Sequence, residues 1–148
     1  MGSNSHFTVA LHILLRISFE KDKSQPYVSS EQIAKSVNTH AVFIRRILGA
    51  LNKAGLVEVR RGGVNGGWIL GKSPEEINLL DVYTAVVDDP LNEMHHSEPN
   101  RKCPIGRGIQ PALSHYYESA EAAFRSELAK TTLAKLMHDT LDFAAEDE

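Results

Sequence analysis

Two short stretches of the sequence gather side chains that can hold a polyanion. One spans the start of a predicted helix and offers hydroxyl, imidazole, aromatic and guanidinium groups, at Thr39, His40, Phe43, Arg45 and Arg46. The other lies in a glycine-rich segment and contributes Arg60, Arg61 and Asn65. Arginine holds phosphate groups or hydrogen-bonds a guanine with two N–H groups, and glycine lets backbone come close to a duplex. The pattern predicts contact with DNA; a solvated basic surface is the alternative.

The net charge of −3 conceals a strong asymmetry along the 148 residues. Residues 1–72 contain 10 Lys and Arg against 4 Asp and Glu, a net charge of +6. Residues 73–148 contain 6 Lys and Arg against 15 Asp and Glu, a net charge of −9. A basic half joined to an acidic half suggests that the first half meets a polyanion while the second does something else.

Two short helices joined by a tight turn are predicted before Gly55. Ser29, with Gln32 three residues later, forms a capping-box pattern that begins the first helix. The second helix is expected over residues 40–54, where apolar side chains recur three and four positions apart, and Gly55 ends it. This arrangement is typical of a helix-turn-helix.

A β-hairpin is predicted directly after these helices. Residues 56–60 alternate like a strand, and residues 68–70 form the returning strand. Residues 61–67 between them contain four glycines, which suit a hairpin tip. The predicted fold class is therefore mainly α with a small β-hairpin, in the order of a winged helix-turn-helix.

The rest of the chain is predicted to be helical apart from one polar loop. An N-terminal helix running to about residue 19 is apolar on two faces, which indicates burial on both. A long helix is expected over residues 109–130, with an apolar stripe too long for one small domain to cover, and a last helix follows. The predicted organisation is a DNA-binding domain over 1–87, a loop with the single cysteine over 88–108 and C-terminal dimerisation helices over 109–148.

Short segments spread over nearly the whole chain match one known pattern. They are Ala10-Leu11, Ile33-Ala34, residues 51–57, Arg61-Gly62, residues 66–70, residues 77–82 and residues 133–136. In these the chain resembles the Rrf-type family of bacterial winged-helix regulators, the group that includes IscR, NsrR and CymR. The resemblance implies a homodimeric, sequence-specific transcription regulator, expected to be a repressor, that binds a palindromic operator. By position, it also implies DNA contacts from Thr39, His40, Phe43 and Arg45, and wing contacts from Arg61 and Asn65.

The loop after residue 87 departs from many members of that family. Those members hold an iron–sulfur cluster with three closely spaced cysteines, whereas this chain has only Cys103. One thiolate cannot hold such a cluster, so the resemblance is to the clusterless subgroup that includes YwnA, and no cofactor is expected. Positive neighbours and a nearby helix N-terminus favour the thiolate form of Cys103. Cys103 is therefore a candidate redox switch, and a cysteine without a role is the alternative.

Two further patterns offer different chemistry. A metal site could be formed by His95, His96, Cys103 and His115, although adjacent histidines in a polar loop are usually solvated. A phosphate-binding loop is suggested by the spacing of Gly66, Gly71, Lys72 and Ser73. Bulky apolar residues in strand conformation would fill that loop, so their amides would pair in a ladder rather than hold phosphate. We expect no metal site, no nucleotide site and no catalytic constellation.

The composition indicates an ordinary globular protein of the cytoplasm. Charged residues make up 24% of the chain, and no apolar run approaches the length of a membrane span. The leading interpretation is a DNA-binding regulator without enzymatic activity or membrane contact, responsive to an oxidant or a small-molecule effector. The alternatives are a winged helix that binds protein instead of DNA, and a P-loop-like nucleotide-binding enzyme.

Overall fold

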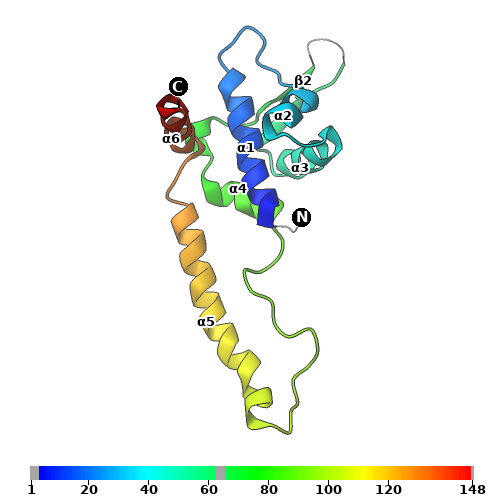
Figure 1. Cartoon of the computed structure of the whole chain (residues 1–148), viewed down its shortest axis with the longest axis vertical. Coiled ribbons are helices and arrows are strands. Elements are labelled where there is room, and N and C mark those ends of the chain that lie inside the picture. Colours follow the sequence, from blue (N-terminus) through cyan, green and yellow to red (C-terminus); the bar gives the residue numbers. More distant parts are fainter. Residues whose placement is uncertain (1–3, 63–65, 148) are drawn as a thin grey trace.

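The computed structural model describes residues 4–62 and 66–147. A group of helices with a two-stranded wing forms one body, and a single long helix extends away from it (Figure 1). The elements follow in the order α1 (Asn4–Glu20), α2 (Ser30–Val37), α3 (Ala41–Lys53), β1 (Val57–Arg60), β2 (Gly67–Leu70), the 3-10 turn η1 (Pro74–Glu76), α4 (Leu79–Val86), α5 (Pro104–Leu128) and α6 (Leu133–Glu146). The predicted fold class is confirmed.

Helix α1 lies at the centre of the body, as its two apolar faces predict. Four of its side chains have no exposed surface: Ala10, Ile13, Leu14 and Ile17. They pack with buried side chains of α2, α3 and α4, which include Ile33, Ile44, Leu48 and Val82. Burial of each large aliphatic side chain stabilises the fold by roughly 1.5–3 kcal/mol. The helix-turn-helix is therefore a rigid unit held from behind by α1.

The turn between α2 and α3 is defined by local hydrogen bonds. The capping box at the start of α2 is present, with the Ser29 hydroxyl accepting from the Gln32 N–H. Helix α2 ends where Asn38 adopts a left-handed conformation, with φ of 65°, a backbone geometry that asparagine tolerates. Helix α3 ends as predicted at Gly55, whose φ is 79°. These signals set the angle at which α3 leaves the turn.

The wing is an antiparallel hairpin whose second strand is held against the body. Val57 pairs with Leu70 and Arg60 with Gly67 in the register of β1 and β2. Trp68 also exchanges backbone hydrogen bonds with Val28, at 2.7 and 2.9 Å. Gly67 lies so close to Val28 that a Cβ atom there would be 2.8 Å from the Val28 backbone. The wing therefore projects from the body at a fixed position.

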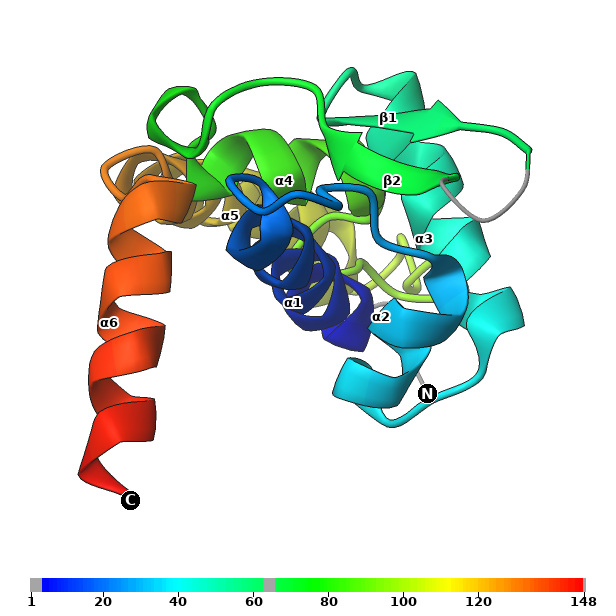
Figure 2. The ribbon, with the colours of Figure 1, turned by 90° about the horizontal axis from the view of Figure 1, so that it is seen from above.

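Helix α6 is attached to the body through its first turn. Asn78 and Thr132 form an isolated β-bridge, and the Leu133 N–H donates to the Ile77 carbonyl at 2.8 Å. Leu133 is fully buried, whereas Phe143 near the other end is 71% exposed. Figure 2 shows α6 extending from the side of the body with a space between it and α1. The cavity there is lined by apolar side chains of both helices, among them Leu11, Leu15 and Leu136.

Helix α5 begins earlier than the sequence indicated, at Pro104 instead of residue 109. Cys103 takes the N-cap position, and proline suits the first helical position because its fixed φ fits a helix and it needs no N–H acceptor. None of the 25 residues of α5 is buried. Contact with α4 is made near the last turns, where the Phe124 ring lies 5.1 Å from that of Tyr83. Most of this long helix has no partner within the described residues of the chain.

The close approach at Gly67 makes a stability prediction. The substitution Gly67→Ala should cost about 1–3 kcal/mol, because φ is 144° and the new methyl group would overlap the Val28 backbone. Gly49→Ala is the matched control, since nothing lies within 4 Å of a Cβ there. In the helix α3 interior, that change should stabilise by about 1 kcal/mol. Urea titration of both variants checks the prediction, and equal midpoints would contradict it.

Candidate nucleic-acid interface

Helix α3 has one face in the core and the other in solvent. Ile44, Ile47, Leu48 and Leu51 are buried against the body. The opposite side is exposed and carries Arg45, Arg46 and Val42, the last with 65% of its surface accessible. A helix anchored along one side and exposed along the other is the geometry with which a recognition helix enters a major groove.

Arg45 is held by α2 in this structure. Its guanidinium forms an ion pair with the Glu31 carboxylate, and its Nε donates to the Ser30 hydroxyl at 3.1 Å. The pKa of Glu31 is lowered, chiefly because its carboxylate accepts its own backbone N–H at the start of α2, with the charge of Arg45 adding to this. Arg46 is exposed, and no ion pair to it is formed within the described residues. The two adjacent arginines therefore differ in how readily they reach a ligand.

Three of the residues predicted to contact DNA lie at or just before the first turn of α3, and one is exposed while two are half-buried. His40 is the exposed N-cap residue of α3 and makes no side-chain capping bond. Thr39 is half-buried, and its N–H donates to the Ala34 carbonyl at 3.0 Å. The Phe43 ring is also half-buried, with its centroid 5.4 Å from the ring of His6 in α1. Phe43 thus contacts α1 as well as lying near the recognition surface.

The wing brings the second predicted group of arginines to the surface. Arg60 and Arg61 are both exposed. The Arg60 guanidinium lies over the Tyr27 ring, 5.4 Å from its centroid, which is the distance of a cation–π contact. Asn65, predicted as a wing contact, lies outside the described residues. Sequence reasoning missed Tyr27 and Glu31, because each acts on an arginine that is distant in sequence.

Cys103 is exposed at the N-cap of α5. Two of its basic neighbours already have partners. Arg107 Nη1 donates to the Arg101 carbonyl at 2.7 Å, and Arg101 Nη1 forms an ion pair with Glu98 Oε1 at 3.4 Å. The thiol is therefore accessible to reagents, and its role as a redox switch stays a prediction.

The two alternative sites do not assemble. His95 instead shares a hydrogen bond with Gln110, at 3.3 Å, and no group of three His, Cys, Asp or Glu side chains able to hold a metal is present in residues 4–62 and 66–147. In the phosphate-loop pattern, Trp68 to Leu70 lie in β2, and the Gly71 N–H donates to the Leu56 carbonyl at 2.9 Å. The Trp68 N–H donates to the Val28 carbonyl, so these amides are paired with backbone carbonyls and form no phosphate-binding loop.

Comparison with known proteins decides the family. The profile of the Rrf2 family, described as an iron-dependent transcriptional regulator, matches residues 3–139. The chain belongs to the Rrf2 family of transcriptional regulators. The chain is also similar to YwnA of Bacillus subtilis (strain 168), a candidate HTH-type transcriptional regulator. The two are 42% identical over 135 residues, which cover 91% of this chain and 96% of YwnA.

Solved structures of similar proteins have the same fold. One, of a candidate DNA-binding protein, is 38% identical, covers 90% of this chain and 99% of its own, and has a TM-score of 0.70. Another, of a candidate transcriptional regulator from Lactobacillus plantarum, is 26% identical with a TM-score of 0.75, and covers 97% and 99% of the two chains. This Rrf2-family chain is a DNA-binding transcription regulator, not an enzyme. No helix in the described part of the chain is both long and apolar enough to cross a membrane.

The iron in the description of the family does not fit the residues of this chain. Thiolates are the usual ligands of an iron–sulfur cluster, and the sequence contains one cysteine. That cysteine has no cluster of His, Asp or Glu around it among the residues described. The residues of this chain therefore do not suit an iron–sulfur cluster.

The ion pair on the recognition surface makes a prediction about DNA affinity. Glu31→Gln should strengthen binding to any duplex about threefold to tenfold, because it removes a carboxylate near the phosphates and frees the Arg45 guanidinium. The slope of log K against log salt should steepen by about one phosphate contact. Glu127→Gln on α5 is the control, with the same change of charge far from α3. Fluorescence anisotropy at two salt concentrations measures both, and unchanged affinity in Glu31→Gln would count against this surface.

Proposed function

We propose that this chain is a homodimeric repressor that reads a palindromic operator in the cytoplasm through α3 and the wing. The observation that carries the proposal is the basic, exposed face of α3 beside the exposed arginines of the wing. His40, Arg45 and Arg46 lie on the helix, and Arg60 and Arg61 extend the surface along the hairpin. Thr39 is proposed to contact the backbone of the duplex at the turn. Phe43 is proposed to hold α3 against α1 at the edge of the contact.

The dimer is proposed to form along α5. Helix α5 extends beyond the body (Figure 1), and its side chains Ile105 and Tyr116 are 73% and 70% exposed. Such a row of apolar side chains is stabilised when a second copy covers it, and a two-fold axis then places two recognition helices on one face. Two half-sites about one helical turn apart, in opposite orientation, follow from that symmetry.

The first experiment separates base reading from phosphate binding. Arg45→Ala should cost about 1–3 kcal/mol on the preferred sequence and relax the preference at one position. Arg61→Ala should weaken binding evenly across sequences and lower the salt slope by about one. Lys130→Ala, which removes one positive charge at the end of α5, is the control. Selection from random duplexes followed by gel-shift titration measures these effects. A protein that prefers no sequence in any pool would overturn the proposal.

The second experiment tests the dimer. Tyr116→Glu should convert the dimer to monomers without unfolding them, because most of this side chain is exposed within the chain while a partner would bury the charge. Ala122→Glu, also exposed and on the opposite side of α5 from the apolar stripe, is the control and should leave the dimer intact. Sedimentation velocity at micromolar concentration distinguishes the two states. A monomeric unmodified protein would contradict the proposed assembly.

A further inference from the structure

The two arginines of the wing have different surroundings. The Arg60 guanidinium lies over the Tyr27 ring, 5.4 Å from its centroid. Arg61, the next residue, is exposed, and it forms no ion pair or ring contact within the part of the chain that the structure describes. Tyr27 therefore contacts one wing arginine and leaves the other in solvent.

Tyr27 belongs to a backbone segment that pairs with the wing. The next residue, Val28, forms an isolated β-bridge with Trp68 of β2, with N···O distances of 2.7 and 2.9 Å. Since side chains alternate along an extended segment and Val28 is buried, Tyr27 faces the other side of the hairpin. Its side chain is half-buried and lies outside the hydrophobic core formed by the described residues. The backbone bridge, and not core packing, thus sets the position of this ring.

A glycine leaves the space between Tyr27 and Arg60 open. Arg60 pairs with Gly67 in the register of β1 and β2, and paired residues of antiparallel strands lie on the same face. Gly67 has no side chain, and it lies directly against the backbone of Val28. The Arg60 side chain therefore extends across the hairpin at this position and reaches the Tyr27 ring.

An aromatic ring holds a guanidinium in a different way from a carboxylate. The attraction between a cation and the ring quadrupole leaves the positive charge in place and needs no directed N–H donor. The ion pair of Arg45 with Glu31, in contrast, uses N–H groups of the arginine and neutralises its charge. The N–H groups of Arg60 thus remain able to donate to phosphate oxygens. Holding the side chain also removes part of the conformational entropy that an arginine loses on binding.

We propose that Tyr27 is a positioning residue for DNA binding, which holds the Arg60 guanidinium in the conformation in which it meets a phosphate group of the duplex. This inference rests on the proposed function, because the wing must contact DNA for the conformation of Arg60 to matter. Arg61 has no such support and is ordered only when the duplex binds. The wing therefore presents one arginine that is prepared in the free protein and one that is not.

Two substitutions at Tyr27 separate the ring from the rest of the side chain. Tyr27→Leu should weaken binding to a labelled duplex of mixed sequence about threefold, because Arg60 loses the ring that holds it. Tyr27→Phe keeps the ring and should bind within about twofold of the unmodified protein. Fluorescence anisotropy at low salt measures the affinities, and thermal unfolding shows that both variants are folded at the assay temperature. Equal affinity of Tyr27→Leu and the unmodified protein, or equal weakening by both substitutions, would overturn the proposal.

A double-mutant cycle supplies a readout that a merely structural role of Tyr27 would not move. In a protein that already carries Arg60→Ala, Tyr27→Leu should have no further effect, because the guanidinium that the ring holds is absent. In a protein that carries Arg61→Ala, the matched control, Tyr27→Leu should still weaken binding about threefold. Equal losses in the two backgrounds would show that Tyr27 acts without Arg60 and would contradict the proposal.

NMR of the full-length protein without DNA tests the contact by itself. The ring current should shift the side-chain signals of Arg60 upfield in the unmodified protein and in Tyr27→Phe, relative to Tyr27→Leu. Identical Arg60 signals in all three proteins would overturn the positioning role. Duplex binding without coupling between Tyr27 and Arg60 would remove the role of Tyr27 and leave the proposed function standing. If the unmodified protein binds no duplex, the proposed function fails and the DNA role of Tyr27 fails with it, whatever the NMR signals show of the contact.

Discussion

The whole arrangement depends on the burial of α1 on more than one side. Ala10, Ile13, Leu14 and Ile17 have no exposed surface, and they join the helix-turn-helix to α4 in one core. A helix with a single apolar face would hold only one of these neighbours. Because protein interiors are close-packed, α1 fixes the positions of both α3 and α4. The N-terminal turn of α1 packs directly against α3, where the rings of His6 and Phe43 have centroids 5.4 Å apart.

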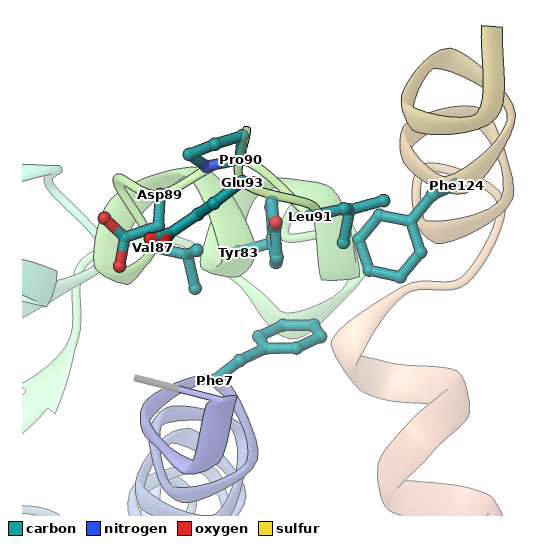
Figure 3. A pocket seen from close by; sticks show the side chains of 8 residues that line it. All are labelled: Phe7, Tyr83, Val87, Asp89, Pro90, Leu91, Glu93 and Phe124. Atoms are coloured by element: carbon teal, nitrogen blue, oxygen red, sulfur yellow. The ribbon is translucent and has the colours of Figure 1, made fainter. Parts of the chain in front are cut away.

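The rings of α1 extend this linkage outward. His6 contacts Phe43 of α3, while Phe7 contacts Tyr83 of α4, which in turn contacts Phe124 of α5. These contacts connect α3 with α5, although α5 has no buried residue of its own. The junction of α1, α4 and α5 (Figure 3) therefore joins the long helix to the helix-turn-helix.

The basic half and the acidic half of the sequence form different parts of the molecule. The basic half of the sequence contains the exposed face of α3 and the wing, and the acidic half contains α4, α5 and α6. Arg45 is paired with the Glu31 carboxylate on the free surface, as Arg16 and Lys23 in the same half are paired with Glu20. In the proposed mode of binding, a duplex displaces the Arg45–Glu31 ion pair before Arg45 reads a base. The pair between exposed groups is weak enough in water for phosphate to compete with it.

Local signals allowed the sequence alone to determine the order of elements. The capping box at Ser29, the glycine after α3 and the glycine-rich hairpin each act within a few residues, so helix-turn-helix and wing were predictable. The sequence pattern places the start of α5 too late, because a cysteine followed by a proline is as typical of a loop as of a helix N-terminus. Tertiary structure alone decided three sets of contacts: Arg45 with Glu31, Arg60 with Tyr27, and the Tyr83 ring with those of Phe7 and Phe124. Each joins residues that are distant in sequence, and only the packing of the elements that contain them brings such residues together.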